Sequence, residues 1–146
     1  MSRLPHIRFL LAVLFASSLL SGCSPTVAPF SARAYEMAVD IKVDASRVVT
    51  RAEEPFDRHR SRVESLRIRM QKAEEYAKGR PRNEHSSRQW SIMNDPNGFM
   101  LGGFLARWEA EDSLSHAFIV EAGSLIEEGF DAIIGLESGK VGNNRK

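Results

Sequence analysis

Apolar side chains recur at helical spacing through two long segments of the chain. In the first segment, residues 34–77, the steps between apolar positions alternate between four and three residues, apart from one doubled step of four. The mean step is about 3.6 residues, the period of an amphipathic helix that packs on a partner. This segment therefore predicts helix rather than strand. The stripe comprises positions 34, 38, 41, 45, 48, 52, 56, 59, 63, 66, 70, 73 and 77.

Pro55 interrupts this stripe just after the doubled step. A proline inside a helix removes one backbone hydrogen bond and clashes with the preceding turn, so the segment either bends there or divides into two helices. Because the stripe continues in phase beyond Pro55, we expect a kink. The helical segment should end near Lys78, because Gly79 and Pro81 follow it.

A second long helix is predicted from about Phe99 to Leu136, after a connection with a turn-like sequence at residues 94–98. In its later half the apolar residues cover an arc of about 160°, which is wider than one neighbouring helix can cover. The sequence therefore predicts an all-α fold, either a long antiparallel helical hairpin or a small helical bundle. The arc comprises Phe118, Ile119, Ala122, Leu125, Ile126, Phe130, Ala132, Ile133 and Leu136.

The start of the chain has a different pattern. Arg3 and Arg8 precede residues 9–20, which carry no charge. A basic head followed by a short apolar run is typical of a secretory signal peptide. The run is shorter than the roughly 20 residues that cross a bilayer core. We expect residues 1–22 to be a signal peptide that is removed.

The apolar run ends in Leu20, Ser21, Gly22 and Cys23, and Cys23 is the only cysteine of the chain. These residues resemble the lipobox of bacterial lipoprotein precursors, an aliphatic residue and two small residues before a cysteine. The resemblance implies cleavage between Gly22 and Cys23, a diacylglycerol thioether on Cys23 and usually an acylated new amino terminus. Two or three acyl chains give a durable membrane anchor. The alternative is an ordinary signal peptide, or an uncleaved N-terminal helix, with a cysteine placed by chance.

The same resemblance bears on where the protein is sorted. Ser24 follows the cysteine, where aspartate tends to retain lipoproteins in the inner membrane. We therefore expect attachment to the bacterial cell membrane, and to the outer membrane facing the periplasm if the organism is Gram-negative. The expected organisation is a lipidated cysteine with a short proline-containing tether at residues 23–31, a helical domain at 32–137 and a flexible tail at 138–146.

The chain has a net charge of only +1, but its charges are segregated. Residues 58–82 carry nine basic and three acidic side chains, a balance of +6, and residues 95–137 carry nine acidic side chains against Arg107, a balance of −8. We expect internal matching, with the basic stretch beside the early acidic stretch and the later acids near Arg47, Arg51 and the start of the first helical segment. Contact of the basic stretch with anionic phospholipid or lipopolysaccharide is the alternative. No binding to nucleic acid is expected.

No motif points to catalysis or to a cofactor. His59, His85 and His116 follow the signal peptide, and no two of them have a metal-ligand spacing. The serines stand in no nucleophile motif, and adjacent acidic residues diverge on a helix. We therefore predict no catalytic residue, no metal, no cofactor and no enzymatic activity.

Residues 99–108 contain Gly102 and Gly103, although each glycine inside a helix costs about 1 kcal/mol against alanine. Close packing explains the pair if another backbone approaches, and apolar residues at helical spacing usually belong to the core. The alternative is a tip that docks on a partner or dips into lipid. That tip would comprise Phe99, Met100, Phe104 and Trp108.

Together these observations predict a membrane-anchored interaction or scaffold module of the cell envelope. Its expected partners are the membrane, through the lipid anchor, and an unidentified envelope protein, and self-association stays open. The alternative is a small inhibitor or exclusion-type lipoprotein that blocks a partner enzyme or an incoming factor.

Overall fold

Residues 27–140 are described by the computed structural model, and within them the chain forms α-helices, one short 3₁₀ turn and no strand. This confirms the all-α fold, in the form of a small helical bundle. None of the helices in this range is long and apolar enough to cross a membrane. The elements are α2 (Ala32–Val49), η2 (Phe56–Arg58), α3 (Arg60–Lys78), α4 (Glu84–Asn94), α5 (Leu101–Glu111) and α6 (His116–Gly139).

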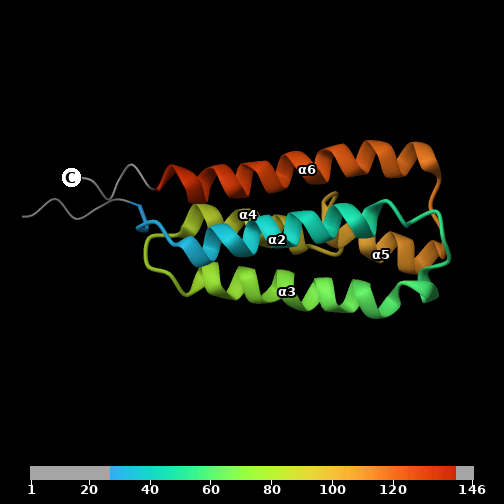
Figure 1. Ribbon diagram of the computed structural model, residues 1–146, viewed down its shortest axis with the longest axis horizontal. Helices are drawn as coiled ribbons and strands as arrows, with labels where there is room; N and C mark the ends of the chain where they lie inside the picture. Colours follow the sequence, from blue (N-terminus) through green and yellow to red (C-terminus); the bar gives the residue numbers. More distant parts are fainter. Residues whose placement is uncertain (1–26, 141–146) are drawn as a thin grey trace, which may run out of the picture.

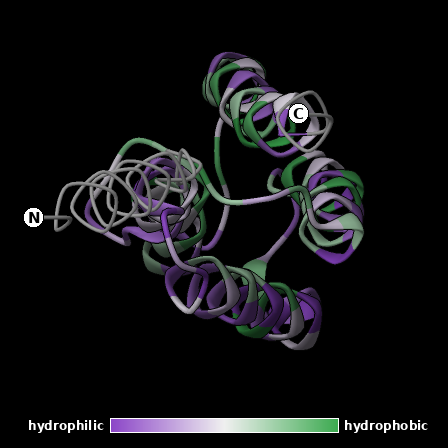
Figure 2. Cartoon of the chain, turned by 90° about the vertical axis from the view of Figure 1, so that its left-hand side faces the viewer, coloured by the Kyte–Doolittle hydropathy of each residue, from purple (hydrophilic) through white to green (hydrophobic). Residues whose placement is uncertain are grey.

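The helices form four rods that run alternately up and down, with α4 and α5 following one another in a single rod (Figure 1). Helix α2 packs on α3 and α6, and α4 packs on the same two helices, so the four rods close a ring around one core. The view along the bundle shows this ring end-on (Figure 2). We call the end where α2 begins and α6 ends the entry end, and the opposite end the far end.

The first helical segment divides at Pro55, so the predicted kink is wrong. Helix α2 ends at Val49, and the chain reverses direction before α3 begins at Arg60. Pro55 has an extended conformation with φ −54° and ψ 130°. The apolar stripe stays in phase across the reversal because Ala52 and Phe56, inside the turn, are buried in the same core as both helices.

The second helical segment also divides, against the expectation of one helix from residue 99 to 136. Asp112 ends α5 with a positive φ of 64°, a conformation that few non-glycine residues adopt. Ser115 then caps α6 by accepting a hydrogen bond of 3.4 Å from the backbone N–H of Phe118. Helix α6 packs on both α2 and α4, so two neighbours cover part of the wide apolar arc, whereas Leu125, Ala132 and Leu136 of that arc are exposed.

The core continues along the whole bundle. Trp90 meets Phe130 edge-on in the entry half, with ring centroids 6.2 Å apart. Phe56 meets Trp108 edge-on at the far end, with ring centroids 5.5 Å apart. Such aromatic pairs add to the stabilisation from their buried area.

The two glycines of α5 are explained by the turn that precedes the helix. A Cβ atom on Gly102 would lie 2.4 Å from the backbone oxygen of Asn94, and one on Gly103 would lie 1.8 Å from the backbone oxygen of Gly98. Close backbone approach, the packing interpretation, is therefore confirmed. The approaching backbone belongs to Asn94, the last residue of α4, and to the turn that follows it at residues 95–98.

Candidate functional site

The lipobox residues Leu20, Ser21, Gly22 and Cys23 lie outside the part of the chain that the structure describes. The predicted anchor and its cleavage site therefore stay predictions. The candidate partner-binding residues, in contrast, all lie on or next to α5.

These four residues separate into two groups. Phe99, just before α5, is 89% exposed, whereas Phe104 and Trp108 are buried in the core and Met100 is partly buried against it. The indole N–H of Trp108 donates to the backbone oxygens of Glu54 at 3.0 Å and Asp112 at 3.2 Å. Phe104 and Trp108 belong to the core, and Phe99 is the most exposed member of the set.

Phe99 stands beside a groove between α5 and α6, which we call the apolar groove. Phe104 and Phe118 stack in parallel there, with ring centroids 5.9 Å apart and planes 5° from parallel. Leu125, which is half-exposed, extends the apolar lining along α6. The groove encloses about 640 Å³, enough for the apolar side chains of a docked segment.

The rim of the apolar groove is acidic. Glu121 and Glu128 line it, and neither forms an ion pair within residues 27–140. Arg107 lies 4.2 Å from the centre of the Phe118 ring and donates to Glu111 at 2.8 Å, so its charge is already partnered. The groove therefore combines an apolar lining with two unneutralised carboxylates.

A buried polar cluster that the sequence did not predict lies at the entry end. The Lys140 ammonium donates to Glu137 at 2.6 Å, to Asn83 at 2.6 Å and to Ser86 at 2.9 Å. Arg80 donates to the other Glu137 oxygen at 3.0 Å. We call these five residues the clasp, because they join the end of α6 to the start of α4 and the loop before it.

The clasp is saturated rather than reactive. All three N–H donors of Lys140 are used, and both Glu137 oxygens accept. Burial raises the pKa of Glu137, but hydrogen bonds to Lys140 and Ser86 outweigh it and hold that pKa below its ordinary value. The arrangement therefore stabilises the fold, with no free donor on Lys140 for a substrate.

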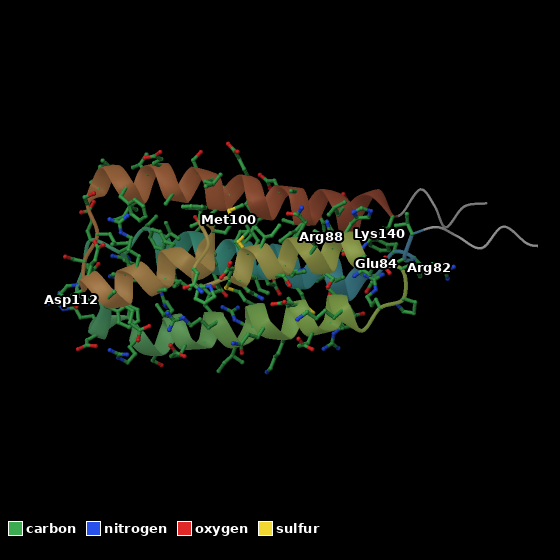
Figure 3. The ribbon with its side chains drawn as sticks, turned by 180° about the vertical axis from the view of Figure 1, so that it is seen from behind. Arg82, Glu84, Arg88, Met100, Asp112 and Lys140 are labelled. Atoms are coloured by element: carbon green, nitrogen blue, oxygen red, sulfur yellow. The ribbon has the colours of Figure 1, made fainter. Side chains whose placement is uncertain are left out.

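Residues 28–31, expected to belong to the proline-containing tether, pack onto the entry end. Ala28 is fully buried, and its N–H donates to the Arg82 backbone oxygen at 2.9 Å. The hydroxyls of Ser31 and Tyr76 lie 3.0 Å apart. Arg82 and Lys140 lie at this end and Asp112 at the far end (Figure 3).

Helix α6 also extends beyond the expected domain end at residue 137. It continues through Gly139, and Lys140 is buried in the clasp. The rest of the predicted tail, residues 141–146, lies outside the described residues.

His59 and His116 each contact a single carboxylate. His59 lies 3.0 Å from Glu54, and His116 lies 2.6 Å from Glu53. Hydrogen bonds to His59 and Arg51 lower the pKa of Glu54. Across residues 27–140, no three His, Cys, Asp or Glu side chains are grouped as metal ligands would be.

The predicted charge matching is present in part. Arg60 and Arg67 of α3 bind the Glu109 carboxylate of α5 at 3.0 and 2.8 Å, which confirms that the basic stretch lies beside the early acidic stretch. Lys42 of α2 pairs with Asp131 of α6 at 2.5 Å, so a later acid does lie beside the first helical segment as expected. Arg47 and Arg51, however, pair with Asp44 and Glu54 of their own segment, so their expected proximity to later acids is wrong. Each partner lies three residues away in the chain, which makes these local pairs easier to form.

Comparison with known proteins returns no match for this chain among family models, curated proteins or solved structures.

Proposed function

We propose that this chain is a bacterial lipoprotein, anchored through Cys23, whose bundle is an interaction or scaffold module of the cell envelope. The anchor proposal rests on the lipobox-like residues 20–23. Ser24 favours the outer membrane, facing the periplasm, in a Gram-negative cell. The interaction proposal rests on one observation, the apolar groove with exposed Phe99 beside it.

The chemistry of the apolar groove defines the partner. An amphipathic helix that lays its apolar side chains into a groove is a common form of protein recognition. The unpaired Glu121 and Glu128 favour a helix with lysine or arginine beside its apolar face, because complementary charge speeds and orients docking. The proposed partner is therefore an envelope protein that exposes a basic amphipathic helix.

The placement of the groove fits this role. The described chain enters at one end of the bundle (Figure 1), and the groove lies beside α5 and the first half of α6, toward the far end. A partner can therefore approach it without displacing residues 28–31, which pack on the entry end.

The anchor is tested by replacing the cysteine. Cys23→Ser should abolish labelling with radioactive palmitate and leave unprocessed precursor in the cell. Palmitate incorporation into that variant would contradict the lipoprotein assignment.

The groove is tested by capture from detergent-solubilised envelope with the full chain. Phe99→Ala combined with Leu125→Ser should remove a captured protein, whereas Ile68→Ala, at a half-exposed residue of α3, should retain it. Equal capture by all three proteins would contradict docking in the groove. A captured envelope complex supports the scaffold role, and a single soluble hydrolase or foreign protein supports the inhibitor alternative.

Sedimentation of the purified chain separates self-association from docking of another protein. A dimer that dissociates in the Phe99→Ala, Leu125→Ser variant would show that a second copy occupies the groove.

A further inference from the structure

A second groove lies between α2 and α3, on the edge of the bundle opposite the apolar groove. We call it the arginine groove, because five arginines and two serine hydroxyls line it. Its residues belong to the later part of α2, the turn that follows and the first half of α3, so it also lies toward the far end. The arginines are Arg47, Arg51, Arg58, Arg62 and Arg69.

The positive charge of the arginine groove exceeds its local negative charge. Asp44 pairs with Arg69 and lies 3.8 Å from Arg47, and Glu54 pairs with Arg51 at 3.2 Å. Arg58 and Arg62 form no ion pair within residues 27–140. Five guanidinium groups therefore face two carboxylates, an excess of three positive charges.

One buried donor in the groove lacks an acceptor. The Nε atom of Arg69 is buried and has no hydrogen-bond partner in the described chain, although the same guanidinium binds Asp44 through Nη1. Protein atoms cover this Nε, so a ligand in the groove would bind Arg69 through its other guanidinium nitrogen, Nη2, which no hydrogen bond within residues 27–140 uses.

The side chains define the class of ligand. Arginine guanidinium groups match the oxygens of phosphate with paired N–H donors, and the hydroxyls of Ser61 and Ser65 add donors beside them. Arg62 and Arg69 are separated by about 10 Å along α3, which suits more than one phosphate group. His59 is the aromatic ring in the lining, but it packs on Trp108 and contacts Glu54, which leaves no platform for stacking bases.

We infer that the arginine groove binds a ligand with more than one phosphate group, through Arg58, Arg62 and Arg69. The phosphates can belong to a soluble molecule or to lipid headgroups, because the same donors recognise both. This site is separate from the apolar groove and does not depend on the proposed protein partner.

The test is calorimetric titration of the full chain, purified in a non-ionic detergent, with inorganic tripolyphosphate. We expect saturable binding that weakens as salt is added. The Arg58→Gln, Arg62→Gln variant should lose about tenfold or more in affinity, because each lost arginine removes a charge-assisted hydrogen bond. It should fold normally, since neither side chain has an ion-pair partner in residues 27–140.

Lys72→Gln with Arg88→Gln is the matched control, because it removes two exposed charges that do not line the arginine groove. It should bind tripolyphosphate within about twofold of the parent. An equal loss in this control would show attraction to net charge alone and overturn the site. The absence of saturable binding to the parent at about physiological ionic strength would also overturn it.

A second arm identifies the source of the phosphate. The same titration is repeated in micelles doped with phosphatidylglycerol or with phosphatidylcholine. Weaker tripolyphosphate binding in the phosphatidylglycerol micelles assigns the arginine groove to lipid headgroups. Equal binding in both micelles assigns it to a soluble phosphorylated ligand.

Discussion

Trp108 of α5 donates its indole N–H to the backbone oxygen of Glu54, 54 residues earlier in the chain, over 3.0 Å. The two turns at the far end are joined further by the backbone hydrogen bonds of Phe56 to Asp112 and of Leu114 to Ala52, each 2.8 Å long. One buried side chain therefore links two turns that each reverse the chain, and this makes it a sensitive point for mutation.

Trp108→Phe should destabilise the protein more than the loss of ring area alone. The variant keeps an aromatic ring in the core but leaves the partly buried Glu54 carbonyl without its donor, at a cost of about 1 kcal/mol. The control is Trp90→Phe, because Trp90 is also buried but its N–H forms no hydrogen bond within residues 27–140. Urea denaturation measures both, and equal losses would show that the hydrogen bond contributes nothing.

Replacing Gly103 and Gly135 with alanine should change the stability of the protein in opposite directions. Gly103→Ala forces a Cβ against the Gly98 carbonyl and should destabilise the fold by about 2 kcal/mol or more. Gly135→Ala should stabilise it by up to about 1 kcal/mol, because no atom lies near the new methyl group and alanine favours helix. Thermal unfolding of both variants provides the measurement. A stabilised Gly103→Ala would contradict the close approach of residues 94–98.

The clasp predicts a dependence of stability on pH. The folded-state pKa of Glu137 is lowered, so its contribution is complete above the unfolded value of about 4.5 and disappears as pH falls through the folded value. At pH 7, Glu137→Gln should cost about 3–5 kcal/mol, because it leaves the Lys140 charge buried without its counter-ion. The difference in unfolding free energy between parent and variant should shrink below about pH 4.5.

Glu121→Gln is the control for this pH series, because Glu121 is exposed and forms no ion pair in the described chain. Its unfolding free energy should follow that of the parent at every pH. A Glu137→Gln difference that stays constant into acid would contradict the assignment of the effect to this carboxylate.

Two neighbouring residues of α6, buried Ile126 and half-exposed Leu125, should differ in how strongly aspartate destabilises the protein. Ile126→Asp should cost several kcal/mol, because it places an unpaired carboxylate in the core that α2 and α4 cover. Leu125→Asp, one residue earlier and half-exposed, should cost about 1 kcal/mol or less. Circular dichroism during thermal unfolding compares them, and equal melting temperatures would show that the apolar arc is not covered.

The helical period predicted the core well because buried positions recur whether a helix continues or turns back. For the same reason it could not distinguish a kink at Pro55 from a reversal, since Ala52 and Phe56 remain buried within the turn. The helical period also could not show where α5 ends. Asp112 adopts a positive φ, and its carbonyl accepts a hydrogen bond from Phe56, a partner far away in sequence.

The candidate surfaces were predictable only in part. Phe99, Phe104 and Trp108 looked equivalent in the sequence, because helical spacing alone could not show which of them another helix would cover. The clasp was missed because Glu137 and Lys140 sit in a polar, glycine-containing stretch that is typical of a flexible tail. Their burial depends on Asn83 and Ser86, which are brought to the same end only by the fold.

The packing of Ala28 on the entry end sets how far the bundle can move if Cys23 carries the lipid. Residues 24–27 alone separate that cysteine from Ala28, and a fully extended stretch of this length reaches only about 17 Å. The bundle would then diffuse laterally within a thin layer above the bilayer. Partners confined to the same layer would meet it at a high effective concentration, so a weak contact in dilute solution could still be occupied at the membrane surface.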